Sequence, residues 1–193
     1  MGIEFELKYR ATPEQLDAIA LAVEGEREKF SMHTTYYDTP SGALSERRYT
    51  LRRRMENAIS VCTLKFPAGE QGRGEIELAC DEIEKAIPEL CKLSGLDDLP
   101  GLLEEGIVPV CGAKFQRTAV IVPLKDCTVE WALDRGILYG GGREEDLCEA
   151  EVELKDGDRQ SAVLYATLMA NRFGLVPEER SKFRRALALA RGE

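Results

Sequence analysis

In several segments of this chain every second residue is charged, and in some of these segments the charges are nearly all of one sign. Residues two apart in a β-strand lie on the same face of the sheet. The segment 3–10 alternates in this way, with an apolar face opposite a charged one. The charged face consists of Glu4, Glu6, Lys8 and Arg10. The chain must therefore bury the apolar faces of strands whose other faces carry concentrated charge.

Other segments repeat the pattern with different signs. Their polar faces are Thr50, Arg52 and Arg54; Thr63 and Lys65; Arg73, Glu75 and Glu77; Glu130, Ala132 and Asp134; and Glu149, Glu151, Glu153 and Lys155. Carboxylates crowded on one face repel one another unless a cation lies among them. Crowded arginines suit a polyanion, because the guanidinium fork matches phosphate oxygens. We interpret these faces as turned inward around one metal- and phosphate-binding lumen. Periodicity alone leaves open the alternative of charged faces in water.

Hydrophobic periodicity and turn residues give the expected elements. The expected strands are 3–10, 30–39, 49–55, 59–66, 72–80, 108–122, 128–134, 137–139 and 147–155. The expected helices are 13–23 with Thr12 as N-cap, 81–93 with Asp81 as cap, 97–105, 158–173, and 181–190 with Ser181 as cap. This order predicts an α+β fold: an eight-stranded antiparallel β-barrel, or tunnel, with a charged lumen and helices packed outside. We expect a single domain spanning 1–193.

Composition limits the possible partners. The chain of 193 residues has a formal net charge of −9, so its surface repels nucleic acid and anionic membranes. It has no apolar run long enough to span a bilayer and no N-terminal signal peptide, so we expect a cytoplasmic protein. A small anion in a locally basic site remains compatible with this charge.

The candidate ligands are all oxygen donors, which favours Mg²⁺ or Mn²⁺ over zinc. Glu4 and Glu6 lie about 7 Å apart along their strand, so their carboxylates can converge on one ion. A second ion could lie with Glu149, Glu151 and Glu153 and hold an attacking water. The sequence has no P-loop, and we interpret Gly140–Gly142 as a turn.

Eight segments, taken together in this order, resemble a known family. They are Glu4-Phe5-Glu6-Leu7-Lys8, Tyr36-Tyr37-Asp38-Thr39-Pro40, Leu51-Arg52-Arg53-Arg54, Thr63-Leu64-Lys65, Arg73-Gly74-Glu75-Ile76-Glu77, Glu130 to Asp134, Glu149 to Lys155, and Ser181-Lys182-Phe183-Arg184-Arg185-Ala186. The series is similar to the ExExK, YxDTP, LRxR, TLK, RxExE and SKxxRA signatures of the CYTH superfamily, also called triphosphate tunnel metalloenzymes. The resemblance covers essentially the whole chain and favours the bacterial inorganic triphosphatase branch.

The resemblance implies roles for individual residues. The implied catalytic residues are Glu4, Glu6, Glu151 and Glu153, and the implied metal ligands are Glu4, Glu6, Glu149, Glu151 and Glu153. The phosphates would be held by Lys8, Arg52, Arg54, Lys65, Arg117 and Lys182, with Glu75, Glu77 and Asp134 as secondary polar partners. Lys114 stands where family members often have arginine near the Arg117 strand, and we include it among the substrate-binding candidates.

These features predict divalent-metal-dependent hydrolysis of the phosphoanhydride bond of inorganic triphosphate, or of an organic triphosphate. Class IV adenylate cyclase and thiamine triphosphatase are the enzymatic alternatives within the same family. A polyphosphate or nucleotide sensor and a salt-bridged barrel without ligand are the non-enzymatic ones. The expected partner is a small-molecule triphosphate, with no nucleic acid and no membrane; monomer and homodimer remain open.

Overall fold

The computed structural model describes residues 2–3, 5–68 and 72–193. Its strands are β1 (Gly2–Ile3), β2 (Glu6–Arg10), β3 (Glu26–Asp38), β4 (Thr50–Glu56), β5 (Ile59–Ala68), β6 (Gly72–Ala79), β7 (Val108–Pro123), β8 (Cys127–Gly140), β9 (Arg143–Gly157) and β10 (Val176–Pro177). Its helices are α1 (Pro13–Ala22), α2 (Ala43–Glu46), α3 (Ile83–Ser94), α4 (Leu99–Leu102), the 3₁₀ turn η1 (Leu103–Glu105), α5 (Arg159–Phe173) and α6 (Lys182–Arg191). None of the described helices is long and apolar enough to cross a membrane.

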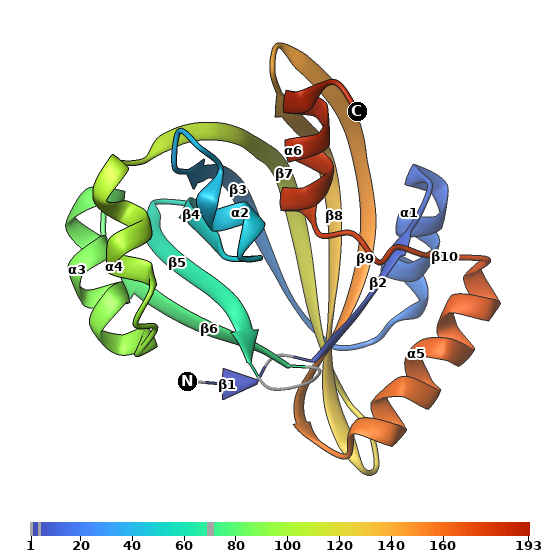
Figure 1. Ribbon diagram of the computed structural model, residues 1–193. Helices are drawn as coiled ribbons and strands as arrows, with labels where there is room; N and C mark the ends of the chain where they lie inside the picture. The colour runs from blue at the N-terminus through green and yellow to red at the C-terminus, as the bar shows by residue number, and fades with distance from the viewer. Residues whose placement is uncertain (1, 4, 69–71) are drawn as a thin grey trace.

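All described strands belong to one antiparallel sheet, as the sequence predicts. Their order is β1-β6-β5-β4-β3-β7-β8-β9-β2-β10, so the described sheet has ten strands instead of the predicted eight. The two extra strands are the two-residue pieces β1 and β10. Over the residues that the structure describes, the hydrogen-bonded ladder has two ends and is not a closed barrel. Its edges are linked through the chain, because β1 pairs with β6 while the consecutive β2 pairs with β9 (Figure 1).

Some strands are longer than their sequence pattern indicates. The prediction of separate strands 128–134 and 137–139 is wrong, because β8 runs unbroken through Arg135 and Gly136. A Cβ on Gly136 would lie 2.1 Å from the carbonyl oxygen of Lys114, so glycine allows close approach here and does not make a turn. The strand predicted from residue 30 begins at Glu26, since its charged start pairs with the end of β7. The Gly140–Gly142 turn between β8 and β9 is confirmed.

Helix starts follow local capping chemistry. Thr12 caps α1 as predicted: its Oγ1 accepts from the Gln15 amide at 3.2 Å, and Gln15 Oε1 accepts from the Thr12 amide at 2.8 Å. Ser181 caps α6 as predicted by accepting from the Arg184 amide at 3.2 Å. Asp81 is not the cap of α3, which begins after Glu82 without a side-chain cap bond among the described residues.

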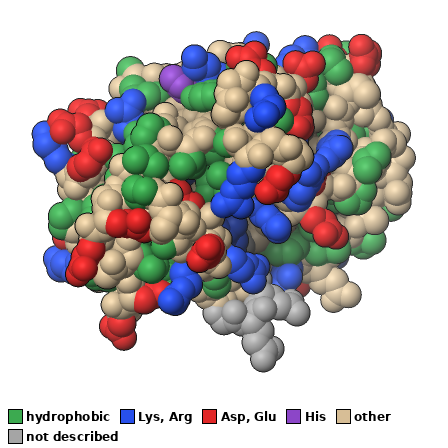
Figure 2. All heavy atoms as spheres, turned by 45° about the horizontal axis from the view of Figure 1, so that its top comes forward, with side chains coloured by type: hydrophobic (Ala, Val, Ile, Leu, Met, Phe, Trp, Pro, Cys, Tyr) green, Lys and Arg blue, Asp and Glu red, His purple; other side chains and the backbone are tan. Residues whose placement is uncertain are grey.

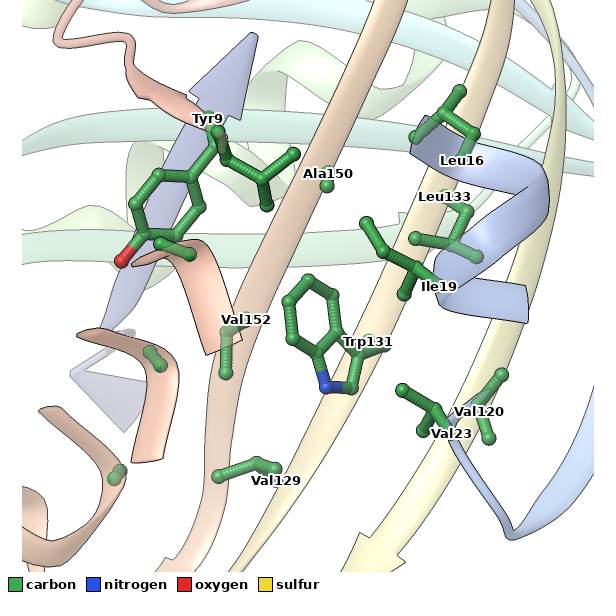
Figure 3. Close-up of a cluster of buried hydrophobic side chains, with 14 of the residues drawn as sticks. Tyr9, Leu16, Ile19, Val23, Val120, Val129, Trp131, Leu133, Ala150 and Val152 are labelled. Atoms are coloured by element: carbon green, nitrogen blue, oxygen red, sulfur yellow. The ribbon is translucent and has the colours of Figure 1, made fainter. Parts of the chain in front are cut away.

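Helices cover the outer faces of the sheet in two places (Figure 1). Helices α3 and α4 pack on β4–β6, with Leu51 and Leu64 facing Leu90 in a buried cluster. Helices α1 and α5 pack on β2, β8 and β9 around Trp131, which is fully buried beside Ile19 of α1 (Figure 3). These clusters bury the apolar strand faces and leave the charged faces on the concave side.

Helix α6 lies at the concave side instead. Its Phe183 packs in a third cluster with Met32 and Phe115, and the rings of Tyr36 and Phe183 lie 5.1 Å apart. Met32, Phe115 and Phe183 also line the space enclosed by the sheet. The N-terminal end of α6 therefore forms part of the wall of that space.

Candidate functional site

The concave side of the sheet encloses a cavity of about 360 Å³. Its described acidic lining residues are Glu6, Glu56, Glu75, Glu77, Glu130, Glu151 and Glu153. Its described basic lining residues are Lys8, Arg52, Arg54, Lys65, Arg73, Arg117, Lys155 and Lys182. Figure 2 shows a hollowed face of the molecule on which Lys and Arg side chains gather. The prediction that the charged strand faces turn toward a shared lumen is confirmed.

One wall of the cavity is rich in carboxylates and is built from β8, β9 and β2. Strand register produces it: Glu153 lies opposite Glu130 on one side and opposite Glu6 on the other. Lys8 lies opposite Glu151, and its Nζ is 3.1 Å from Glu6 Oε1. Three adjacent strands thus place oxygen donors side by side, with lysine ammonium groups between them.

The other wall, from β4 to β6, is basic, and glutamates of the same strands lie among its cations. Arg52 Nη2 and Lys65 Nζ lie 3.4 and 3.1 Å from Glu75 Oε1. Arg54 contacts Glu56 and lies 3.7 Å from Glu77 Oε1. Burial, followed by repulsion from Arg52, lowers the pKa of Arg54. The Arg54 Nε is buried and has no hydrogen-bond partner among the described residues, so this guanidinium retains donor capacity toward an anion.

A buried ion network lies where β7–β9 meet α6. Arg117 donates to both Asp134 oxygens at 2.8 and 2.7 Å, and to Glu151 Oε2 at 2.6 Å. The Lys182 Nζ lies 2.8 Å from both Asp134 Oδ2 and Glu151 Oε1, and it also donates to Glu149. The side chains of Asp134 and Glu149 are fully buried. Every carboxylate of this network therefore has a cationic partner in place of water.

The network separates the protonation behaviour of two neighbouring glutamates. Burial raises the pKa of Glu149 to about 7. Burial also acts on Glu151, but Lys182 and Arg117 outweigh it and hold the pKa of Glu151 well below its ordinary value. The same carboxylates raise the pKa of Lys182 well above its ordinary value despite burial. Glu151 and Lys182 are thus fixed as an ion pair.

The structure places most of the residues singled out by sequence in this cavity, with four exceptions. Asp134 is fully buried behind the cavity wall, where it pairs with Arg117 and Lys182. Glu4 lies outside the described residues. Glu149 lies behind the cavity wall and is held by Lys182 and by Arg185 Nη1 at 3.1 Å. Lys114 is exposed on the opposite face of β7, with its Nζ 5.8 Å from the Tyr139 ring centroid. It is three residues from Arg117, and an odd separation along a strand puts two side chains on opposite faces.

Sequence reasoning gave no individual role to several members of the site. Arg73, Glu130 and Lys155 lie on strand faces that it placed around the lumen, and they line the cavity as expected. Glu56, which lines the cavity, and Arg185, which contacts Glu149, were not singled out. Arg185 could have been found, since it lies three residues after Lys182 on the same helix face.

Two groups of carboxylates could hold a divalent cation. Oxygen atoms of Asp134, Glu149 and Glu151 lie within 4.8 Å of one another, but the Lys182 ammonium contacts all three side chains. Glu6 and Glu153 lie on neighbouring strands at the cavity wall. Both groups offer only oxygen donors, which fits a hard cation such as Mg²⁺ or Mn²⁺.

A ten-stranded antiparallel sheet with opposed basic and acidic walls around one cavity defines a tunnel-like fold that can bind a small polyanion. Residues 2–186 match the CYTH domain, and the chain belongs to that family.

Similarity to individual proteins agrees with this assignment. The chain is 32% identical over 139 residues to the inorganic triphosphatase of Haemophilus influenzae, a match that covers 70% of this chain and 39% of that protein. The chain thus spans about two fifths of that relative.

Two solved structures share the fold. A Hippeastrum protein, HpAC1, for which a dominant triphosphatase activity is described, has a TM-score of 0.66 at 18% identity over 99% of this chain and 97% of its own. The PH1819 protein of Pyrococcus horikoshii OT3 has a TM-score of 0.63 at 21% identity over 95% and 98%.

Proposed function

We propose that this chain is a divalent-metal-dependent triphosphatase that hydrolyses a phosphoanhydride bond of inorganic triphosphate. The observation that carries the proposal is the cavity, in which eight basic and seven acidic described side chains face one enclosed space. Such a density of lysine and arginine suits a compact polyanion, and phosphoryl transfer depends mainly on positioning and charge neutralisation. The similarity to a Haemophilus inorganic triphosphatase supports the same substrate class.

The basic wall and the end of α6 would bind the phosphates. Arg52, Arg54 and Lys65 reach the cavity from adjacent strands, while Lys8 and Lys182 reach it from the other side. On the basic wall four of their ion pairs measure 3.1 to 3.7 Å, and Arg54 also contacts Glu56 closely. Phosphate oxygens can replace these carboxylate contacts, because the guanidinium fork and the ammonium group bind either anion.

The carboxylate wall would hold Mg²⁺ or Mn²⁺. Glu6 and Glu153 offer oxygen donors there, and Glu4 is proposed to join them from the same N-terminal segment. When bound, the ion supplies neutralisation of phosphate charge and a water of lowered pKa.

The residues of this wall divide into two roles. Glu151 is held by Lys182 and Arg117, so we assign it to orienting these cations. Glu153 lies opposite Glu6 and Glu130, where it can orient the attacking water toward the terminal phosphate.

Inorganic triphosphate fits this cavity better than a nucleotide or thiamine triphosphate. A base or thiazole ring would need exposed apolar surface beside the phosphates. Among the apolar lining residues, Met32, Phe115 and Phe183 are only 5 to 7% exposed, because they pack together between the sheet and α6, and Phe30 is partly buried.

A substrate panel tests the proposal. The full chain is incubated with inorganic triphosphate, ATP or thiamine triphosphate, in Mg²⁺, Mn²⁺ or EDTA, while phosphate, pyrophosphate and cyclic AMP are assayed together. We expect phosphate release from inorganic triphosphate that stops in EDTA. Cyclic AMP from ATP would identify a cyclase instead. Tight binding without release of any product would identify a sensor.

A further inference from the structure

Helix α6 carries two buried cations on the face that meets the sheet. Lys182 and Arg185 are one turn apart, which places them on the same side of the helix. They are only 9% and 5% exposed, whereas Arg184 between them is exposed. A helix that buries two cations needs matching carboxylates, and both cations find one in Glu149.

Glu149 bridges the two cations. One of its oxygens accepts from Lys182, and the other accepts from Arg185 Nη1 at 3.1 Å. The second terminal nitrogen of Arg185 reaches Glu145 Oε1 at 2.6 Å, so this guanidinium spans two carboxylates of β9. Arg185 does not line the cavity, and its link to that space runs through Glu149 and Lys182.

The three carboxylates that could hold a metal already have cationic partners. Asp134, Glu149 and Glu151 provide three carboxylates, and Lys182, Arg117 and Arg185 provide three cations in direct contact with them. A divalent ion at the three carboxylates would have to displace the Lys182 ammonium. The displaced ammonium would then be buried without a partner, which is strongly unfavourable.

We propose that Asp134, Glu149 and Glu151 form a cradle for the Lys182 ammonium and do not bind the metal, and that Arg185 is the positioning residue that fixes Lys182 through Glu149. The effect on ligand binding rests on the proposed function, because a fixed Lys182 presents its charge to a phosphate at the cavity wall. A lysine side chain loses much rotamer freedom when it is held in this way. Because Arg185 helps to order Lys182 in the free protein, less of this entropy is lost when the ligand binds.

Amine footprinting tests the position of Lys182 independently of any substrate. The full chain is treated briefly with acetic anhydride, and acetylation of Lys182 is measured by mass spectrometry. We expect little modification in the wild type, a several-fold rise in R185M, and a partial return of protection in R185K. The matched control R184M changes an exposed arginine on the same helix and should leave protection unchanged. Equal protection of Lys182 in R185M and the wild type would overturn the positioning role.

A double-mutant cycle tests the path through Lys182. Affinity for inorganic triphosphate is measured by calorimetry in EDTA for the wild type, R185M, K182M and the double variant. We expect R185M to weaken binding about tenfold in the wild type and by less than about twofold in K182M, since contacting residues are non-additive. If R185M weakens triphosphate binding by the same factor in the wild type and in K182M, Arg185 acts through folding and not through Lys182. A wild type that does not bind triphosphate would refute the proposed function, while the footprinting would still decide the position of Lys182.

Mn²⁺ binding tests the claim that Asp134, Glu149 and Glu151 do not bind the metal. Binding of Mn²⁺ is followed by electron paramagnetic resonance in the wild type, E149Q and E6Q. We expect E149Q to keep Mn²⁺ affinity within about twofold and to lose protection of Lys182, whereas E6Q loses Mn²⁺ affinity. Loss of Mn²⁺ binding in E149Q with Lys182 still protected would overturn the cradle.

Discussion

The buried network beside α6 and the basic wall of β4–β6 use the same residue types in opposite ways. In the network the contacts of Arg117 with Asp134 and Glu151 measure 2.6 to 2.8 Å, and Asp134 is fully buried. On the basic wall Arg52 lies 3.4 and 3.6 Å from Glu75 and Glu77, Lys65 lies 3.1 Å from Glu75, and Glu77 is 45% exposed. Several short ion pairs that are shielded from water fix a side chain in one position. Longer ion pairs near solvent leave the side chain able to exchange partners. The network is therefore a scaffold that holds Lys182 at the cavity wall, whereas the basic wall can exchange its present partners for a ligand.

The largest expected effect is a loss of folding free energy when the buried network is disrupted. Asp134→Ala removes a carboxylate that contacts both Arg117 and Lys182, and leaves these cations buried with fewer partners. Losing one partner of a buried ion pair costs about 3–5 kcal/mol of folding free energy. Urea unfolding should show a loss of this size.

The matched control is Glu77→Ala on the basic wall. Its carboxylate is 45% exposed and lies 3.6 and 3.7 Å from the two arginines, so we expect a loss below about 1 kcal/mol. Similar losses for Asp134→Ala and Glu77→Ala would remove the distinction between scaffold and binding surface.

The next effect concerns ligand affinity. Arg54→Met should weaken binding of inorganic triphosphate about tenfold to a hundredfold, because a charged hydrogen bond contributes about 1.5–3 kcal/mol. It should cost less folding free energy than Asp134→Ala. Arg54 contacts Glu56, but its Nε has no partner among the described residues, and burial lowers the Arg54 pKa. Calorimetry and urea unfolding measure the two quantities. A large loss of stability with unchanged affinity would place Arg54 in the scaffold instead.

A smaller effect concerns Glu178, which joins β2 to the segment before α6. Burial would raise the pKa of Glu178, but hydrogen bonds from Arg180 and Arg10 outweigh it and lower the pKa to about 2. Because the folded pKa is depressed, this stabilisation is present above about pH 4.5 and is lost as the pH falls toward 2. The two arginines are about half exposed, so we expect about 1–2 kcal/mol.

Unfolding in urea at pH 6 and pH 3 measures this contribution. The wild type should lose about 1–2 kcal/mol more than Glu178→Gln between the two pH values, since the variant has no carboxylate to titrate there. Parallel losses in both proteins would show that the arginines hold Glu178 too weakly to stabilise the fold.

The smallest expected effect concerns the outer face of β7. Lys114→Ala should change triphosphate affinity by less than about twofold, because Lys114 is exposed and does not line the cavity. A tenfold loss, measured by the same calorimetry, would mean that the ligand is held outside the cavity.

Much of this arrangement follows from local sequence signals. Strand alternation places Glu151 and Glu153 on one face, and the same rule excludes Lys114 from the face of Arg117. Turn and cap residues correctly mark Thr12 and Ser181 as helix starts. These features depend on neighbours within a few residues, so the sequence contains them directly.

Contacts between distant segments do not follow from local signals. Glu149 has the same alternation as Glu151, yet α6 covers it with Lys182 and Arg185. Nothing within a strand predicts which helix will pack over its end. The continuity of β8 through Gly136 also escaped prediction, because a glycine in close contact with β7 resembles a turn glycine in sequence.

The pairing of β2 has a consequence for folding during synthesis. Glu6 is made well before its partner Glu153 in β9. At about 5–20 residues per second, the delay is on the order of ten seconds. During that time the nascent chain carries an unpaired edge strand, which favours association with other chains. Chaperone protection should therefore matter most before translation passes β9.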